Sequence, residues 1–243
     1  MTRRRWIADE VNGERAWLVG EHAHHLVRVL RAEVGQEFDV VADGRLRRSR
    51  ITGITEGRVE FELREELEFA EAASVTLVLA IYKFDRMEWA IEKCTELGVE
   101  RLVPVTARRT DTHLGSAAAK RVDRWRRIAR QAAEQSRRIS VPEVDDPVAF
   151  TEILNTDGAR IALAETERNV LLRDEVRRAV SSAGRDRSTA VTLAIGPEGG
   201  WAEDELLGFA AAGWVSASLG PRILRAETAA IVATAIAMSE LGL

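Results

Sequence analysis

Residues 194–201 read Ala-Ile-Gly-Pro-Glu-Gly-Gly-Trp, and residues 218–228 read Ser-Leu-Gly-Pro-Arg-Ile-Leu-Arg-Ala-Glu-Thr. Each stretch is a short apolar run that ends in Gly-Pro and is followed by a helical pattern. Glycine permits positive φ or a close backbone approach, and proline presets φ and removes a donor. Each stretch therefore predicts a strand that ends in a stiff loop before a helix. Loops at strand ends are where open α/β sheets bind ligands.

The composition indicates one large or two modest folded domains, because 46% of the 243 residues are hydrophobic. The formal net charge of −4 argues against a protein that coats nucleic acid nonspecifically. A single cysteine, Cys94, excludes an intramolecular disulfide framework, and it lies on an apolar helix face that predicts a core position. No secretory signal or membrane-length apolar segment is present, so we expect a cytoplasmic protein without a membrane partner.

Basic residues are concentrated in two places. Residues 108–138 hold ten arginines and lysines against three acids, and residues 45–50 hold four arginines. Such local patches can bind phosphates even on an acidic protein. A solvated helix face is the alternative interpretation.

Residues 1–70 are predicted to form a small β-barrel with an inserted helix. Short strands with partial alternation are expected at 17–19, 37–41, 50–54 and 58–63, with hairpin signals at Asp43-Gly44 and Glu56-Gly57. The helix is expected at 21–31, with Leu26, Val29 and Leu30 buried and His24, Arg28 and Arg31 exposed together. The neighbouring histidines lack the further convergent ligands that zinc needs, so we expect no metal and favour RNA contact.

After a glutamate-rich linker at 64–73, strands and helices alternate. Strands are expected at 75–81, 99–105, 160–164, 190–195 and 214–219, and helices at 85–97, 120–137, 170–180, 203–212 and 226–241. Gly98 is expected to end the first of these helices. This alternation implies a parallel sheet covered on both faces. The last helix is apolar nearly all round, so it is predicted to be buried in the core or against a second subunit.

The charges near the first Gly-Pro loop are informative about its ligand. Glu198 lies inside the loop and the following helix begins with three acids at 203–205, which would repel a phosphate placed there. The phosphate-binding patterns GxxxxGK[ST] and GxGxxG are absent from the sequence. S-adenosylmethionine fits better, because it carries an adenosine and a sulfonium but no phosphate. In the second loop, backbone groups next to Ile223 and Leu224 are what a buried adenine requires.

Five blocks of sequence together resemble the RsmE family of 16S ribosomal RNA uridine-N3 methyltransferases, of the knotted SPOUT class. The blocks are residues 24–31, residues 85–89 with Lys93 and 95–98, residues 133–136 with Arg138 and 141–142, residues 195–200, and residues 218–225 with 227–230. Gly-Pro-Glu-Gly-Gly alone occurs across several SPOUT enzymes. The combination is highly specific.

The resemblance implies a PUA-like RNA-binding barrel at 1–70 and an α/β methyltransferase domain with a deep trefoil knot at 74–243. It also implies a homodimer that packs through the knot. The implied reaction is methylation at N3 of a specific uridine in the decoding region of 16S rRNA, within the assembled small ribosomal subunit. The residues that the resemblance assigns to S-adenosylmethionine are Leu163, Ala164, Gly196, Glu198, Gly199, Leu219, Gly220, Ile223, Leu224 and Ala229.

The residues expected to contact RNA are Arg4, Arg5, His24, Arg28, Arg31, Lys83, Arg86, Arg138 and Arg222. The chain departs from the family pattern at four positions, which are Phe84, Ala107, Arg137 and Ala202. Ala202 stands where the helix after Gly-Gly usually begins with Ser or Thr. Without that side-chain cap the helix loses roughly 1 kcal/mol of N-cap stabilisation.

Uridine N3 is a poor nucleophile until its imide proton leaves. An arginine can stabilise the resulting anion on O2 and O4, and a carboxylate can take the proton. We expect Arg225 or Arg109 to stabilise the charge and Glu227 to accept the proton. Two alternatives stay open: a noncatalytic RNA-binding or ribosome assembly protein that kept the fold, and a SPOUT enzyme that acts on tRNA or on another rRNA position.

Overall fold

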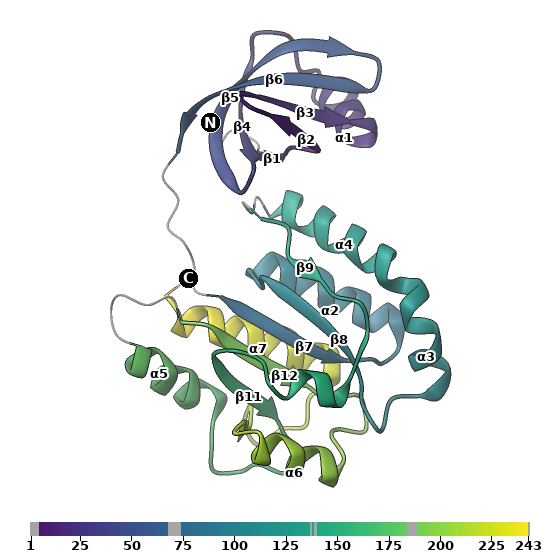
Figure 1. Ribbon diagram of the computed structural model, residues 1–243, viewed down its shortest axis with the longest axis vertical. Helices are drawn as coiled ribbons and strands as arrows, with labels where there is room; N and C mark the ends of the chain where they lie inside the picture. Colours follow the sequence, from purple (N-terminus) through teal and green to yellow (C-terminus); the bar gives the residue numbers. More distant parts are fainter. Residues whose placement is uncertain (1–4, 68–73, 137, 139, 184–188, 243) are drawn as a thin grey trace. The chain divides into compact units, whose positions relative to one another are not determined.

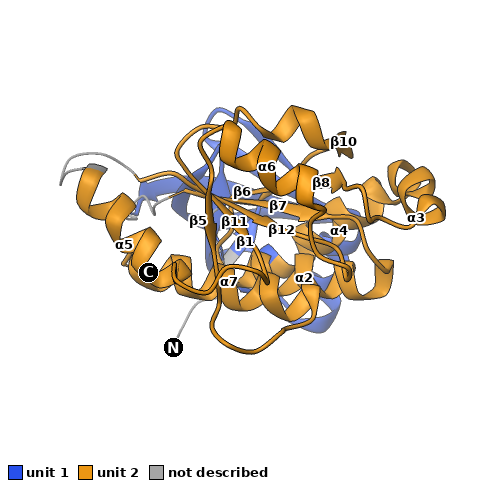
Figure 2. Cartoon of the chain, turned by 90° about the horizontal axis from the view of Figure 1, so that it is seen from below, with its two compact units in different colours: residues 1–71, 133–140 blue, residues 72–132, 141–243 orange. Residues whose placement is uncertain are grey.

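The structure is a computed structural model that describes residues 5–67, 74–136, 138, 140–183 and 189–242. It divides into two compact units (Figure 2): unit 1 holds residues 1–71 and 133–140, and unit 2 holds residues 72–132 and 141–243. The grouping of 133–140 with the N-terminal residues was not expected from the sequence. No helix of the described ranges is long and apolar enough to cross a membrane.

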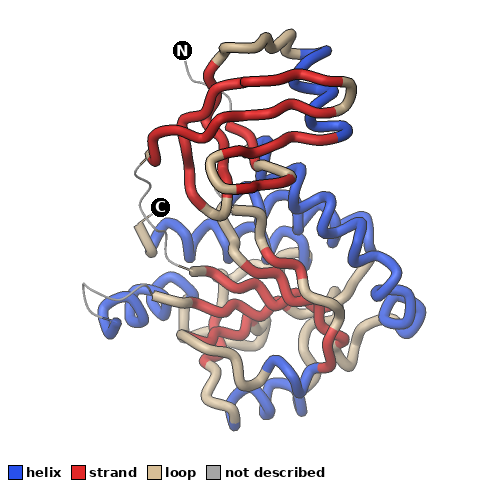
Figure 3. Tube along the Cα trace, turned by 45° about the horizontal axis from the view of Figure 1, so that its top comes forward, coloured by secondary structure: helices blue, strands red, loops and turns tan. Residues whose placement is uncertain are grey.

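Unit 1 is built on a curled six-stranded sheet with the order β1–β4–β5–β6–β3–β2 (Figure 3). Its strands are β1 (Arg5–Ile7), β2 (Glu10–Asn12), β3 (Arg15–Val19), β4 (Glu37–Ala42), β5 (Arg45–Thr55) and β6 (Arg58–Glu66). All pairings are antiparallel except β1 with β4. Asp43 and Gly44 both have positive φ, as a two-residue hairpin turn requires. Because β6 runs to Glu66, the first residues of the predicted linker are strand instead.

The inserted helix of unit 1 differs from the prediction in its last turn. It begins as α1 (Gly20–His24) and continues as a π-helical turn η1 (His25–Val29). The N–H of Leu30 donates to the carbonyl of His25 at 3.2 Å, five residues back. Each residue of a π turn advances less far round the axis than in an α-helix. Leu26 is buried as predicted, but Val29 is rotated to the surface with 64% of its area exposed, so its predicted burial is wrong.

Unit 2 is a parallel sheet with the order β10–β8–β7–β12–β11–β13, and β9 pairs with β8 (Figure 1). The strands are β7 (Val75–Ala80), β8 (Arg101–Thr106), β9 (Glu143–Val144), β10 (Val148–Ala149), β11 (Ala159–Leu163), β12 (Val191–Ile195) and β13 (Val215–Ala217). The helices are α2 (Phe84–Leu97), α3 (Thr112–Ala117), η2 (Ala118–Arg121), α4 (Val122–Gln135), η3 (Phe150–Ile153), α5 (Leu172–Ala183), α6 (Glu203–Ala211) and α7 (Ala226–Glu240). The predicted parallel sheet is confirmed.

Helices cover both faces of this sheet, as Figure 2 shows. Along β7, Leu77 and Leu79 belong to a core that includes residues of α2, α4, α5 and α7. The intervening Val78 and Ala80 belong to a second core that includes residues of η3 and α6. A strand buried on both faces is expected to be largely apolar, which explains why Thr76 is the one polar residue at 75–81.

Helix α7 is buried against its own chain. It packs on α2, α5, β7 and β12, and Ala230, Ala233 and Ala237 are fully buried. Gly98 ends α2 with φ 113°, as predicted. A Cβ at Gly98 would lie 2.3 Å from the Cε of Met238, so the flexible end of that side chain would have to move, and the positive φ is the stronger reason for glycine here.

Candidate functional site

A cavity of about 330 Å³ lies in unit 2 at the carboxyl ends of β11, β12 and β13. Three loops supply most of its lining: residues 163–168 after β11, residues 195–201 after β12 and residues 217–226 after β13. Parallel pairing brings the three strand ends to one edge of the sheet. The cavity is thus where the sequence predicts a ligand site.

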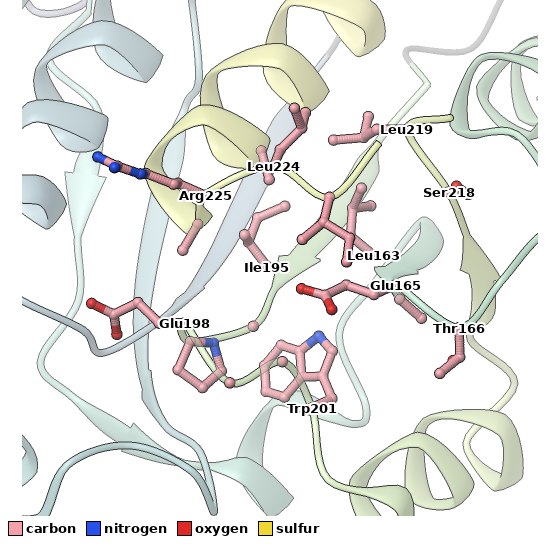
Figure 4. A pocket seen from close by; sticks show the side chains of 18 of the residues that line it. Leu163, Glu165, Thr166, Ile195, Glu198, Trp201, Ser218, Leu219, Leu224 and Arg225 are labelled. Atoms are coloured by element: carbon pink, nitrogen blue, oxygen red, sulfur yellow. The ribbon is translucent and has the colours of Figure 1, made fainter. Parts of the chain in front are cut away.

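The loop after β11 is shaped by Glu167. Its Oε1 accepts bonds from the backbone N–H groups of Asn169, Arg168 and Val170, at 2.7, 2.8 and 3.1 Å. These bonds, led by the one from Asn169, hold the pKa of the Glu167 carboxyl below its usual range. The loop is folded back by this carboxylate, and Glu165 and Thr166 line the cavity (Figure 4).

The loop after β12 is closely packed. The N–H of Gly200 donates to the carbonyl of Pro197 at 2.8 Å and closes a turn. A Cβ at Gly196 would lie only 3.1 Å from the backbone nitrogen of Trp201. Arg109 braces the loop, since its Nη1 donates to the carbonyls of Gly199 at 2.6 Å and Trp201 at 3.2 Å.

Glu205 secures the start of α6, where Ala202 gives no side-chain cap. The buried carboxylate accepts the N–H of Ala202 at 2.8 Å through Oε2 and the N–H of Arg108 at 2.8 Å through Oε1. Asp204 points outward and pairs with the side chain of Arg108. The N3 glutamate therefore supplies half of a capping box whose usual Ser or Thr is missing.

The loop after β13 is more open. The Ser218 hydroxyl accepts the N–H of Gly220 and can donate to its carbonyl, both at 3.1 Å, and Gly220 has φ 120°. Arg222 and Ile223 are exposed, and Ile223 shows 73% of its area. Arg225 is the N-cap residue of α7 and is exposed.

The cavity has an apolar part and a charged part (Figure 4). In this view the indole of Trp201 lies across from the side chains of Leu219 and Leu224, with the Glu165 carboxylate near the indole, while Glu198 and Arg225 extend separately on another side. An apolar slot bordered by loop backbone suits a flat heteroaromatic ring. The charged side chains that line the cavity are Arg109, Glu165, Arg168, Glu198, Arg222 and Arg225.

All ten residues predicted to bind the cofactor line this one cavity, and so do Arg109, Arg222 and Arg225. Glu227 does not line it, because its side chain is buried and its Oε1 lies 3.4 Å from Nη1 of Arg86. The sequence reasoning missed eleven lining residues, which are Glu165, Thr166, Arg168, Ile195, Pro197, Gly200, Trp201, Leu206, Ala217, Ser218 and Ala226. Their position within or next to the three loops was the available signal.

The predicted RNA contacts fall in both units. In unit 1, His24, Arg28 and Arg31 are exposed on α1, η1 and the following turn, as predicted, and Arg138 is half-buried. Arg5 lies in β1, and Arg4 lies outside the described residues. In unit 2, Lys83 is exposed, Arg86 is half-buried and Arg222 is exposed. Part of the basic run is neutralised by ion pairs, since Arg124 bonds to Glu88 at 2.7 Å.

His22 is held between two carboxylates of unit 1. Its Nδ1 lies 3.1 Å from Asp9 and its Nε2 lies 3.1 Å from Glu134. Hydrogen bonds to Asp9 and then Glu134 raise the pKa of His22 to about 9. A protonated imidazole has no lone pair for a metal. Within the described ranges no group of three or more His, Cys, Asp or Glu residues could hold a metal ion.

Cys94 lies in the core of unit 2, as predicted. It is fully buried, and the Thr234 hydroxyl donates to its sulfur at 3.4 Å. Burial raises the pKa of the Cys94 thiol to about 12. Such a thiol is inert rather than nucleophilic.

Comparison with known proteins gives matches along most of the chain. An RNA methyltransferase domain family matches residues 70–238, and an RNA methyltransferase PUA domain family matches residues 18–64. The chain is 31% identical over 224 residues to ribosomal RNA small subunit methyltransferase E of Bacillus subtilis. The matched region covers 89% of this chain and 86% of the relative. It is 32% identical over 218 residues to the protein of that name from Mycobacterium tuberculosis, with 88% and 82% covered.

Two solved structures are similar over nearly their whole length. One is a Legionella pneumophila methyltransferase in complex with S-adenosylmethionine, with a TM-score of 0.79, 28% identity and 98% of both chains covered. The other is ribosomal RNA small subunit methyltransferase E from Neisseria gonorrhoeae bound to S-adenosylmethionine, with a TM-score of 0.79, 29% identity and 96% of both chains covered.

Proposed function

The chain belongs to the ribosomal RNA small subunit methyltransferase E family, and we propose on this basis that it methylates N3 of one uridine in the decoding region of 16S rRNA with S-adenosylmethionine. The family indicated by the five sequence blocks is thereby confirmed. One observation carries the proposal: ten residues from three separate loops and α7, predicted to bind this cofactor, line a single cavity.

The lining of the cavity fits S-adenosylmethionine. Its volume of about 330 Å³ lies within the range of small-molecule sites. Trp201, Leu219 and Leu224 offer apolar surface to the adenine, and the backbone of the tight 195–201 loop offers donors and acceptors. The carboxylates of Glu165 and Glu198 suit a cationic ligand. When bound, the cofactor supplies an electrophilic methyl group on a sulfonium.

We assign stabilisation of the uridine anion to Arg225. Its side chain is exposed at the cavity, where a guanidinium can face the O2 or O4 of a bound uridine. Arg109, the predicted alternative, is already bonded to the carbonyls of Gly199 and Trp201. Its role in this proposal is to hold the loop after β12.

We assign the proton acceptor to Glu198 instead of the predicted Glu227. A general base must come within hydrogen-bond reach of the proton that it removes. Glu227 is buried outside the cavity lining, whereas Glu198 is exposed, lines the cavity and extends on the same side as Arg225 (Figure 4). Replacement of Glu198 by Gln is expected to lower kcat with little change in the affinity for RNA.

The proposal includes the trefoil knot, the homodimer and the assembled small subunit as substrate. The order of the sheet supports the knot, because β13 is an edge strand and α7, which follows it, packs on the central strands β7 and β12. Between β13 and α7 the chain must therefore return from the edge of the sheet to its centre. Light scattering in solution tests the dimer, and methylation of assembled subunits against free 16S rRNA tests the substrate.

Mapping of modified nucleosides in 16S rRNA tests the reaction. A strain without the gene should lack 3-methyluridine at one site in the decoding region, and the wild-type gene should restore it. If the strain instead lacks a modification in tRNA, the protein is a SPOUT methyltransferase that acts on tRNA. Calorimetry with S-adenosylmethionine tests the remaining alternative, since a noncatalytic RNA-binding protein would give no binding heat.

A further inference from the structure

The proposed reaction leaves the buried carboxylate of Glu227 without a use. Only 4% of the residue is exposed, and its Oε2 has no hydrogen-bond partner among the residues that the structure describes. Its Oε1 accepts one long bond, 3.4 Å, from Nη1 of Arg86. Burial of a half-satisfied carboxylate is costly, and in a native protein it calls for an explanation.

Arg86 stands where a helix disfavours a cation. It is the third residue of α2, in the first turn, where the helix dipole presents its positive end. Its side chain is 32% exposed, so the guanidinium is anchored on Glu227 and open to solvent elsewhere. A guanidinium has five N–H donors, and the contact with Glu227 engages one nitrogen. The pairing with Glu227 offsets an unfavourable position and leaves donors available to a ligand.

The pair lies beside the cavity. Glu227 follows Arg225 and Ala226 directly in the chain, and both of these residues line the cavity. Contact with Glu227 therefore places the Arg86 guanidinium at the N-terminal end of α7, next to the cavity-lining residues. Arg225, the N-cap residue of α7, lines the cavity, and Arg86 of α2 contacts the first turn of the same helix without lining the cavity itself.

Tyr82 adds a second buried polar group to this region. Its side chain is fully buried, and its hydroxyl has no partner within the described part of the chain. Burial first, and then electrostatic interactions with Cys94, Glu227 and Glu198, raise the pKa of the Tyr82 hydroxyl well above its usual range. The hydroxyl therefore stays protonated, as a donor within electrostatic reach of the buried Glu227 and of the cavity-lining Glu198.

We propose that Glu227 is a positioning residue whose carboxylate holds the Arg86 guanidinium beside the cavity, at the first turn of α7, where Arg86 binds a phosphate of the RNA next to the methylated nucleotide. The inference rests on the proposed function. Arginine suits this task because its planar fork can bind two oxygens of a phosphate at once. Phosphate contacts fix the register of a nucleic acid, so the Arg86 contact would place the target base over the cavity.

The test compares Arg86→Ala, Glu227→Gln and the double variant with the wild-type protein. The affinity for a 16S rRNA fragment is measured by fluorescence anisotropy over a range of salt concentrations, beside kcat, both KM values and the calorimetric affinity for S-adenosylmethionine. Arg86→Ala should weaken RNA binding about tenfold and reduce the salt slope by roughly 0.7 to 0.9, one phosphate contact. Glu227→Gln should act in the same direction, and the double variant should be no weaker than Arg86→Ala. The affinity for S-adenosylmethionine should not change.

Arg177→Ala is the matched control. Arg177 donates to Glu240 at 2.6 Å at the opposite end of α7, so this variant also removes one arginine that pairs with a glutamate of that helix. It should leave RNA affinity and the salt slope unchanged. If Glu227→Gln does not fold, Arg86→Lys provides the second test, because it keeps the charge and loses the fork. It should recover only part of the RNA affinity lost in Arg86→Ala.

Three results would overturn the inference. Glu227→Gln could lower kcat and leave the RNA affinity unchanged, and the fold-losses of Glu227→Gln and Arg86→Ala could multiply in the double variant. That result would make Glu227 a direct participant in the reaction. A lower melting temperature without any change in RNA affinity would make the ion pair a helix contact only. A wild-type protein that neither binds S-adenosylmethionine nor methylates 16S rRNA would remove the proposed function, and this inference with it, before any variant is compared.

Discussion

The two Gly-Pro loops resemble each other in sequence and differ in how the protein holds them. The loop at 195–201 is braced by Arg109, closed by a turn at Gly200 and packed so closely that a Cβ at Gly196 would press on the backbone of Gly200 and Trp201. The loop at 217–226 keeps one local pair of contacts between Ser218 and Gly220 and exposes Pro221, Arg222 and Ile223.

This difference indicates a division of labour within the cavity. The first loop is a wall that the fold builds in advance, which reduces the entropy that a ligand must lose on binding. The second loop exposes an isoleucine to water, which favours an arrangement completed by the cofactor or the RNA. Substitutions in the first loop should therefore damage the fold and the site together, and substitutions in the second should damage the site alone.

Gly196→Ala should have the largest effect. The added Cβ would meet the backbone of Trp201 at 3.1 Å and of Gly200 at 3.2 Å, so one side of the wall must shift. We expect unfolding free energy to fall by about 1–3 kcal/mol and the affinity for S-adenosylmethionine to fall about thirtyfold. Chemical denaturation and calorimetry measure the two quantities.

Gly115→Ala is the control for that substitution. A Cβ there would meet the Cγ2 atoms of Thr106 and Thr110 at 3.6 Å, an ordinary contact, and Gly115 lies in α3 outside the cavity lining, so cofactor affinity should stay close to wild type and stability should not fall. Equal effects of the two variants would mean that the packing at Gly196 does not define the wall.

Arg109→Ala should weaken the affinity for S-adenosylmethionine about tenfold, since it removes the charged donor to the Gly199 and Trp201 carbonyls. If Arg109 only braces the loop, saturating cofactor should restore kcat. A kcat that stays low at saturation would return Arg109 to the catalytic role expected from the sequence. Arg108→Ala, which removes a surface ion pair with Asp204 and keeps the backbone bond to Glu205, should change either quantity less than twofold.

The sequence could predict the elements and the loops because both follow from local patterns. The largely apolar stretch at 75–81 predicts a strand, and its adjacent residues Val78 and Leu79 belong to the cores on the two faces of the sheet. The two Gly-Pro stretches predict ligand loops at strand ends, and they meet in one cavity because the parallel sheet aligns those ends.

What the sequence could not predict depends on contacts between distant residues. The exposure of Val29 follows from one π turn, and residues 133–140 group with unit 1, where Glu134 contacts His22. Glu227 belongs to a motif next to the cavity, and a pattern of residue types does not state which side of a helix's first turn is buried. Only the packing of α7 on α2 shows that the carboxylate faces Arg86.

Ile223→Ser tests the second loop. Because the side chain is 73% exposed, the free energy of unfolding should stay within about 0.5 kcal/mol of wild type. The affinity for S-adenosylmethionine should fall about threefold, since the isoleucine would cover part of the bound ligand. Leu207→Ser is the control, because Leu207 is 66% exposed on α6 and lies outside the cavity lining. A large loss of stability in Ile223→Ser would contradict the distinction between the loops.

Ala202→Ser should have the smallest effect and the opposite sign. The N–H of Ala202 already donates to Glu205, but Ala202 offers no oxygen to the N–H groups of the first turn of α6. A serine hydroxyl would complete the capping box, so we expect unfolding free energy to rise by about 0.5–1 kcal/mol and the melting temperature by roughly 1–4 °C. Cofactor affinity should not change, because the wall is already held by Arg109 and by the packing at Gly196. A gain in affinity with the gain in stability would show that the first loop is less completely built in the free protein than its contacts indicate.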